Sequence, residues 1–443
     1  MGNLKTPEKI QKLRQALYAK AKGEPEFRFY LLYDKVYRED ILEYAYACCR
    51  SNDGAPGADG MTFKDVEAYG REKWLGELAS ELREKTYKPG AIRRVYIPKP
   101  NGKQRPLGIP CLKDRVCQTA AMVVLEPIFE ADLPPEQYAY RTGKNALEAV
   151  EEVRILLNHG HQEVVDADLS GYFDTIPHAE LMKSVARRIV DKHILRLIKM
   201  WLEAPVEEDD GAGRRKRTTR NKDERLGIPQ GSPISPLLAN LYMRRFIAGW
   251  KKLGYEERLG GKIVNYADDL VICCRKGMAE IAMLAMRRMM MLLKLTVNEE
   301  KTRICRVPEE SFDFLGYTFG RLYSYRKRKI YIGYKPSKKS ISRLIENIRI
   351  QTARNKGWME AGEMVRHINR KLKGWANYFR LGAVSRIYGR IDMHVSGRLY
   401  RWVCRKHKGK SRAVKRNPNE FFYDKLGLIK LSKIPRIFPW AKA

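Results

Sequence analysis

Two adjacent carboxylates, Asp268 and Asp269, lie between two short apolar stretches of the chain. The stretches Lys262–Tyr266 and Leu270–Cys274 have the composition of β-strands, so the acidic pair is expected at the tip of a β-hairpin. Two like charges this close repel each other, and removing them from water is costly unless a cation neutralises them. Hard carboxylate oxygens suit Mg²⁺. A polar turn would look the same, so the metal hypothesis depends on the rest of the chain.

A site for two metal ions needs a third carboxylate, and a second acidic segment upstream offers one. Val164–Asp168 favours a strand that enters a turn at Ser170–Gly171. Side chains alternate along a strand, so Asp166 and Asp168 share a face and either could point at the metals. We favour Asp168 because it lies nearer the turn, where a site would open. Taken alone, the segment would also suit a strand end with solvated acids.

A basic hairpin is expected over Val95–Pro110, where two strand-like stretches flank a Pro-Asn-Gly turn. Lys99 and Arg105 flank this turn and could clamp a triphosphate, the arginine as a bidentate fork and the lysine as a point charge. On a basic protein, a basic hairpin without this role is an equally good interpretation.

The segment Gly227–Leu241 predicts a loop followed by a buried helix. Gly231 permits a close backbone approach, and Ser235-Pro236 is typical of a helix start. Such a loop could pack against a template–nucleotide pair while Gln230 forms a hydrogen bond near the nucleotide.

The composition favours nucleic acid as the partner. The 443 residues include 86 Lys and Arg against 52 Asp and Glu, a net charge of +34, which suits a polyphosphate. The chain has no apolar run of about 18 residues, so membrane binding is disfavoured. The eight cysteines form no C-x₂-C pair and have no histidine cluster beside them, so we expect neither zinc nor a disulfide framework.

The chain divides by pattern into segments of different character. A basic helical stretch over about 5–50 is followed by a glycine-rich turn at Gly54–Gly60. An α+β core over about 61–320 contains every motif described above, and a helical stretch over about 336–400 precedes a basic end. The acidic-then-basic run at 207–217 is expected to form an exposed hairpin or loop.

In this order, the segments resemble those of a reverse transcriptase, and together they are similar to the bacterial group II intron-encoded subclass. The matching segments are Ile97–Pro100, Asp114–Gln118, Tyr138–Arg141, Pro229–Asn240, Tyr266–Asp269, Leu295–Thr302, Phe314–Tyr317 and Leu372–Phe379. The resemblance implies an α+β right-hand polymerase with three parts. These are fingers and palm over 1–325 (with an N-terminal extension of about 1–50), a helical thumb or maturase (X) domain over 326–400, and a basic nucleic-acid-binding region over 401–443.

The resemblance assigns Asp168, Asp268 and Asp269 to a metal-binding triad for two Mg²⁺ ions, for which Mn²⁺ can substitute. Lys301 matches a lysine near the active site that protonates the leaving pyrophosphate, although an ordinary surface lysine is nearly as good an interpretation. The primer grip corresponds to Phe314, Leu315, Gly316 and Tyr317, whose apolar side chains would also suit a protein core.

Nucleotide contacts follow from the same resemblance. Lys99 and Arg105 would bind the triphosphate, and Gln230 and Gly231 would lie near the incoming nucleotide. Phe173, five residues after the first triad aspartate, matches the bulky residue that clashes with a ribose 2′-OH and so favours deoxynucleotides.

The chain departs from the family pattern in two motifs and in one expected absence. Tyr138–Arg141 is more often Tyr-Gly-Phe-Arg, and Gln230–Ser232 is more often Gln-Gly-Gly. Both changes keep size and polarity similar, so the pocket is expected to survive. No cluster of the His/Asn and Cys endonuclease type is found, so we expect no endonuclease domain and no second-strand cleavage by this polypeptide.

The expected function is therefore RNA-directed DNA synthesis, combined with binding of a group II intron RNA to aid splicing and mobility by target-primed reverse transcription. The expected partners are an RNA template, a DNA primer or target and dNTPs, with no membrane and no zinc. The expected location is the bacterial cytoplasm, and the nucleoid when the protein is on target DNA. Two alternatives remain: a reverse transcriptase adapted to host DNA repair or antiviral defence, and an RNA-binding maturase with idle polymerase chemistry.

Overall fold

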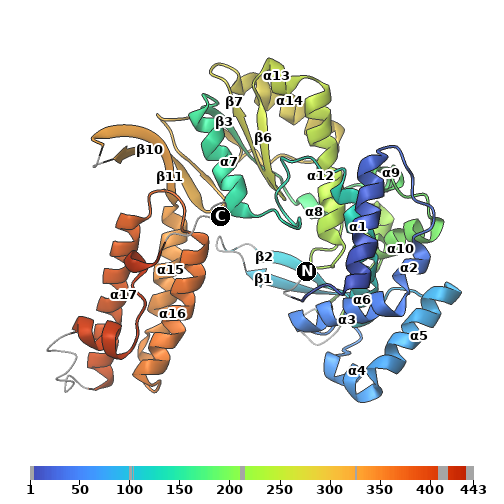
Figure 1. The fold of residues 1–443 in the computed structure, drawn as a ribbon, viewed down its shortest axis with the longest axis horizontal. Helices are drawn as coiled ribbons and strands as arrows, with labels where there is room; N and C mark the ends of the chain where they lie inside the picture. Colours follow the sequence, from blue (N-terminus) through green and yellow to red (C-terminus); the bar gives the residue numbers. More distant parts are fainter. Residues whose placement is uncertain are drawn as a thin grey trace.

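The computed structural model of the protein describes residues 4–98, 102, 104–209, 215–324, 327–407 and 418–435. Figure 1 shows a mixed α/β body at one end and a separate set of long helices at the other. Within the described residues, no helix is long and apolar enough to cross a membrane.

A central antiparallel sheet has the strand order β6-β7-β3-β8. Its strands are β3 (Glu163–Asp168), β6 (Lys262–Tyr266), β7 (Asp269–Cys274) and β8 (Arg303–Arg306). Successive side chains point to opposite faces, and the two faces belong to different cores. Val165 and Ala167 pack into a core with α12 (Ser235–Lys252) and α14 (Ala279–Leu292). Val164 packs into a second core with α7 (Ala146–Asn158).

Helix α6 (Leu112–Glu130) is largely buried among the N-terminal helices, while Lys113, Arg115 and Glu126 are partly exposed. Two of these helices, α1 and α3, pack directly on α6, and α2 also contacts it. The N-terminal helices are α1 (Glu8–Gly23), α2 (Tyr33–Val36), α3 (Glu39–Asn52), α4 (Phe63–Tyr69) and α5 (Arg71–Glu84). Of these, α5 packs on α3 and α4 packs on α5. The expectation of a helical start to the chain is confirmed.

A second sheet, in the order β2-β1-β4-β5, joins segments that are far apart in the sequence. Its strands are β1 (Ile92–Pro98), β2 (Gln104–Ile109), β4 (Val206–Asp209) and β5 (Arg215–Thr218). Glu207 lies opposite Arg217 and Glu208 lies opposite Lys216, so opposite charges support this register. Arg94 of β1 also contacts Glu208, at 3.0 Å. The paired strands of both expected hairpins, over 95–110 and over 207–217, are confirmed, and residues 99–101, 103 and 210–214 between them lie outside the described residues.

Short helices connect the two sheets. They are α8 (Tyr172–Thr175), α9 (His178–Ala186), α10 (Lys192–Leu202), α11 (Arg220–Glu224) and α13 (Tyr255–Arg258). The start of α12 was also predicted: Pro236 lies in its first turn, where a proline costs no helical hydrogen bond.

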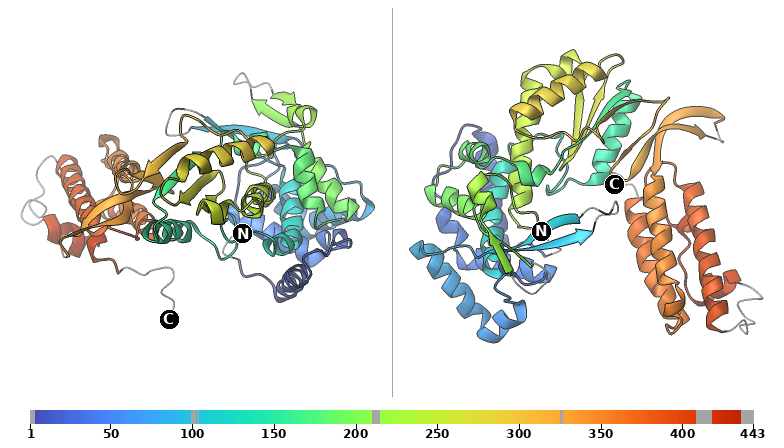
Figure 2. Two further views of the ribbon diagram at one scale, coloured as in Figure 1. Left: turned by 90° about the horizontal axis from the view of Figure 1, so that it is seen from above. Right: turned by 180° about the vertical axis from the view of Figure 1, so that it is seen from behind.

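The C-terminal part is a three-stranded sheet followed by long helices, as Figure 2 shows from two further sides. The strands are β9 (Phe312–Phe314), β10 (Tyr317–Ser324) and β11 (Lys329–Pro336). The helices are α15 (Lys338–Gln351), α16 (Ala361–Tyr378) and α17 (Ser385–Lys406), with short turns η1 (Arg354–Lys356), η2 (Glu420–Lys425) and η3 (Leu431–Lys433).

The described end of the chain packs on these helices. Phe422 and Leu431 belong to the same apolar core as α15–α17. The buried Asp392 carboxylate accepts hydrogen bonds from the backbone N–H groups of Leu431 (2.8 Å) and Ser432 (3.0 Å). The expected domain boundary at 325–326 falls between β10 and β11 and stays a prediction.

Candidate active site

The acidic pair lies where the sequence predicted it, at the turn of the β6–β7 hairpin. Tyr266 pairs with Asp269, which leaves Ala267 and Asp268 as the two turn residues. Ala267 has a φ of 57°, as tight hairpin turns require. The buried Asn265 amide donates hydrogen bonds to the carbonyls of Ala267 (2.9 Å) and Asp269 (3.3 Å) and so holds the turn in shape.

Asp168 is the last residue of β3 and lies directly opposite Asp269 of β7. The two residues are therefore neighbours at the same end of the sheet, with Asp268 in the adjoining turn. Asp166 shares the face of Asp168, but it lies farther from this end and contacts Arg303 at 3.7 Å. This arrangement supports Asp168 over Asp166 as the third carboxylate.

Three side chains from one later segment support Asp168. Lys301 Nζ lies 2.8 Å from Asp168 Oδ2, and Asn298 Nδ2 donates to the same oxygen at 2.9 Å. The Asp168 backbone N–H donates to the Thr302 hydroxyl at 3.3 Å. Sequence reasoning singled out Lys301 but missed Asn298. A polar residue three positions before Lys301 was the available signal.

The acidic cluster carries more negative charge than its neighbours balance. Asp269 reaches solvent, yet the surrounding protein and the charges of Asp268 and Asp168 raise its pKa to about 7. In the described residues, the ion pair between Lys301 and Asp168 is the one ion pair that the triad forms. No three His, Cys, Asp or Glu side chains of the described chain are close enough as placed to hold an ion. Hard oxygens with excess negative charge fit a divalent cation.

The glycine-containing loop between α11 and α12 is joined to the basic hairpin. The Gly108 N–H of β2 donates to the Gln230 carbonyl at 2.6 Å. Gly231 has a φ of +112°, and a Cβ there would lie 2.5 Å from the Gly108 carbonyl oxygen. The predicted close backbone approach at Gly231 is confirmed, and its partner is strand β2. The Gln230 side chain contacts Asp174 Oδ2 at 3.3 Å.

The structure describes one of the two cations, Lys99 and Arg105, that were predicted to bind the triphosphate. Arg105 lies exposed on β2, opposite Ile97 of β1. Lys99 lies outside the described residues. Desolvation and the charge of Asp268 raise the pKa of the Tyr140 phenol, and Arg105 opposes this rise. Tyr140 therefore lies near both charges. Arg105 and the acidic hairpin therefore approach one common region, and sequence reasoning gave Tyr140 no role in it.

Phe173 is half-buried in α8 directly after the turn that follows β3. The Ile228 N–H donates to the Phe173 carbonyl at 2.7 Å. The adjacent Tyr172 is buried and donates its hydroxyl to the Ala239 carbonyl at 2.6 Å. These contacts fix the backbone that carries the Phe173 ring.

The candidate primer grip is a turn between β9 and β10, with Phe314 paired to Tyr317. Both aromatic residues are buried. The Tyr317 hydroxyl donates to the Tyr378 carbonyl at 2.5 Å, and the Tyr378 hydroxyl donates back to the Leu315 carbonyl at 2.8 Å. Burial and the nearby Tyr266 and Asp269 raise the pKa of Tyr378 to about 12. The end of α16 therefore reaches the acidic hairpin.

Comparison with known families agrees with this geometry. Residues 97–319 match the model described as "Reverse transcriptase (RNA-dependent DNA polymerase)". Residues 341–419 match "Group II intron, maturase-specific domain". The chain belongs to the group II intron reverse transcriptase/maturase family.

Two relatives show how far the similarity of this reverse transcriptase extends. Protein YkfC of Escherichia coli (strain K12) is 31% identical over 348 residues, which cover 70% of this chain and 87% of YkfC. Group II intron-encoded protein LtrA of Lactococcus lactis subsp. cremoris is 32% identical over 216 residues, 48% of this chain and 34% of LtrA. The expectation of a reverse transcriptase followed by a maturase domain is confirmed.

The reverse transcriptase also has a cavity of about 810 Å³ beside the site. Tyr266 of the acidic hairpin, Tyr140 and Gly231 line one side of it, and Arg115 of α6 and Tyr44 of α3 line another. The cavity connects the candidate nucleotide loop to the N-terminal helices.

Proposed function

We propose that this reverse transcriptase extends a DNA primer along an RNA template at the end of the central sheet. The observation that carries the proposal is the position of Asp168 opposite Asp269, with Asp268 in the adjoining turn. The test is primer extension on an RNA template with dNTPs, and the chain should incorporate deoxynucleotides only when a divalent cation is present.

Asp168, Asp268 and Asp269 would hold two Mg²⁺ ions, or Mn²⁺ in their place. Such ions supply activation of the primer 3′-OH and stabilisation of the leaving pyrophosphate. The excess negative charge of the cluster supports this assignment. The Asn298 amide orients the Asp168 carboxylate by donating to its Oδ2, and the Asn265 amide holds the backbone of the turn that carries Asp268.

Arg105 would bind the triphosphate of the incoming nucleotide from the basic hairpin, together with Lys99. A guanidinium forms paired hydrogen bonds with phosphate oxygens and neutralises the charge that develops there. Gln230 would lie on the same side, since its backbone is bonded to β2. The chain would thus position the nucleotide and contribute little covalent chemistry.

Phe173→Ala should relax the choice of sugar. Removing the ring opens space for a ribose 2′-OH, and pocket contacts of this size change selectivity by about tenfold or more. The measurement is the ratio of kcat/KM for dCTP to that for CTP. Phe173→Tyr keeps the ring and should keep the ratio; an unchanged ratio in Phe173→Ala would remove the steric role.

Lys301→Arg and Lys301→Gln should both lower the single-turnover rate, by roughly 10²-fold. A glutamine amide cannot donate a proton as a general acid, and a guanidinium releases its proton less readily than an ammonium, although arginine preserves the ion pair with Asp168. The measurement is the rate of a single nucleotide addition as a function of pH. Full activity in Lys301→Arg would mean that Lys301 only balances the charge of Asp168.

We infer that the RNA bound by this protein includes a group II intron RNA and that it supports splicing and target-primed mobility. The match of residues 341–419 to a maturase-specific domain and the net charge of +34 support this inference. The DNA that flanks the coding sequence tests it. Intron RNA domains there are expected, and their absence would favour a role in repair or defence.

A further inference from the structure

One buried histidine, beside the loop that carries Gln230 (residues 225–234, the Gln230 loop), has no place in the proposed chemistry. His178 is the first residue of α9 and is 7% exposed. Its Nε2 lies 2.8 Å from the Gly227 carbonyl oxygen, and the ring donates this hydrogen bond because a carbonyl can only accept. Burial lowers the pKa of His178, so the neutral ring keeps its proton on Nε2 near neutral pH. The ring is therefore a constant donor to the loop.

Backbone hydrogen bonds hold the Gln230 loop against the segment that contains Phe173. The two segments run antiparallel, with Pro177 opposite Leu226. The bonds between them run from the His178 N–H to the Arg225 carbonyl (2.9 Å), from the Gly227 N–H to the Ile176 carbonyl (2.9 Å) and from the Ile228 N–H to the Phe173 carbonyl (2.7 Å). The His178 ring adds a side-chain donor to these backbone bonds.

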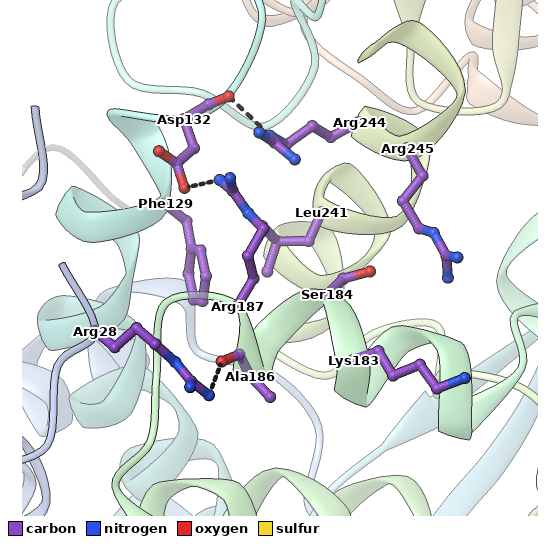
Figure 3. Close-up of a pocket in the computed structure, with 10 residues that line it drawn as sticks. All are labelled: Arg28, Phe129, Asp132, Lys183, Ser184, Ala186, Arg187, Leu241, Arg244 and Arg245. Carbon is purple, nitrogen blue, oxygen red and sulfur yellow. Dashed lines mark hydrogen bonds and ion pairs between the residues drawn. The ribbon is translucent and has the colours of Figure 1, made fainter. Parts of the chain in front are cut away.

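The helix that carries His178 is anchored on two neighbouring elements. Figure 3 shows the far end of α9, where Arg187 contacts Asp132 directly after α6. Nearer His178, the Glu180 carboxylate forms an ion pair with Arg245 of α12 at 2.8 Å. Because these contacts hold α9 in place, His178 is the fixed partner of the bond and the Gln230 loop is the partner that can move.

The Gln230 loop has close contact on one side and open space on the other. Gly227 has a φ of +90°, and a Cβ there would lie 3.1 Å from the Asp174 carbonyl oxygen. A cavity of about 390 Å³ borders the same contact, and Ile228 and Gln230 are among the residues that line it. Without the His178 donor, the buried Gly227 carbonyl would lose this hydrogen bond, and the loop would shift toward the cavity to recover one from water.

We propose that His178 is a positioning residue that sets the separation between Phe173 and the Gln230 loop and thereby favours deoxynucleotides over ribonucleotides. The proposal rests on the proposed function, because that function places Phe173 at the sugar and Gln230 near the nucleotide. The Gly227 carbonyl lies between the two, since Ile228 follows it and bonds the Phe173 carbonyl. A shift of the loop would widen the space for a ribose 2′-OH and move Gln230 at the same time. The acidic triad lies on the central sheet and would stay in place.

His178→Phe tests the proposal, because it keeps an aromatic ring and removes the donor. In primer extension on an RNA template, the KM for dCTP should rise by about tenfold, and the ratio of kcat/KM for dCTP to that for CTP should fall by about tenfold. The kcat for dCTP and the Mg²⁺ concentration at half-maximal rate should stay close to the wild-type values. His178→Gln supplies an amide N–H that can reach the same carbonyl and should restore both the KM and the ratio.

The matched control is His161→Phe, which removes a similar bond far from the nucleotide. His161 Nδ1 lies 2.8 Å from the Gly260 carbonyl oxygen, at the end of the central sheet opposite to Asp168. The control should lower the melting temperature and keep the KM and the ratio, because a smaller folded fraction lowers only the apparent kcat. Equal changes in the two Phe variants, an unchanged ratio in His178→Phe, or no recovery in His178→Gln would overturn the proposal.

Failure of the proposed function itself gives a different result, in which the wild type adds no nucleotide. Amide hydrogen exchange needs no substrate and still tests His178 in that case. Residues 226–230 should exchange about tenfold faster in His178→Phe and at the wild-type rate in His178→Gln, because the Gly227 and Ile228 N–H groups bond to the segment of Phe173. Wild-type exchange in His178→Phe would show that the ring does not hold the loop, and the proposal would be rejected.

Discussion

Replacing Asp268 with alanine should abolish measurable primer extension, with a fall of about a thousandfold or more in rate. Metal coordination in the transition state contributes several kcal/mol, and each 1.36 kcal/mol corresponds to a factor of about ten. The measurement is single-turnover extension of a DNA primer on an RNA template across a range of Mg²⁺ concentrations. The variant should remain slow at every concentration.

The fold should survive this substitution. Asp268 lies in a two-residue turn, and its charge helps to raise the pKa of Asp269, so its removal relieves repulsion. The melting temperature in the absence of metal should stay the same or rise. Glu84→Ala, which removes a carboxylate from the exposed end of α5, is the control and should retain full activity. Extension by Asp268→Ala at the control rate would reject the triad.

Replacing Gly231 with alanine should be the second severe change. The new Cβ would lie 2.5 Å from the Gly108 carbonyl oxygen, and the φ of +112° is unfavourable for any residue with a side chain. The loop must move away from β2 and carry Gln230 with it. A displacement of about 1 Å at a reacting centre can cost about 10²-fold in rate. We expect a reduction of this size in kcat/KM for dNTPs.

Gly160→Ala separates backbone strain from the steric clash. Gly160 also has a positive φ, of 90°, but a Cβ there would meet nothing within 4 Å. The control should lower the melting temperature slightly, by the cost of the strained backbone, and leave kcat/KM intact. Similar kinetic effects from the two substitutions would show that contact between the loop and β2 is unimportant.

Local pattern was sufficient to predict the elements that carry the acidic residues. Alternating and apolar stretches gave the β6–β7 hairpin, and a strand followed by a turn placed Asp168 at the end of β3. The position of Pro236 in the first turn of α12 follows from local chemistry in the same way. In each case the backbone preference of a few consecutive residues agrees with the final fold.

Contacts between distant segments could not be predicted in this way. Asn298 binds Asp168 across 130 residues, and Gly231 packs on Gly108 from a different element. The sequence predicted that Gly231 permits a close backbone approach and gave a template–nucleotide pair as the candidate neighbour of its loop, but it did not predict the contact with Gly108 of β2. The roles assigned to Lys301 and Phe173 came from family resemblance, because neither residue type has a distinctive local signature.

The second sheet has a mechanical consequence for substrate sensing. Strand β1 is bonded to β2 on one edge and, in parallel, to β4 on the other, and β2 is bonded to the Gln230 loop. If Arg105 binds the nucleotide as proposed, a movement of β2 would pass through these hydrogen bonds to the loop and to the charged β4–β5 hairpin. Nucleotide occupancy would thus be transmitted as a rigid-body tilt to a surface more than a hundred residues away in the chain.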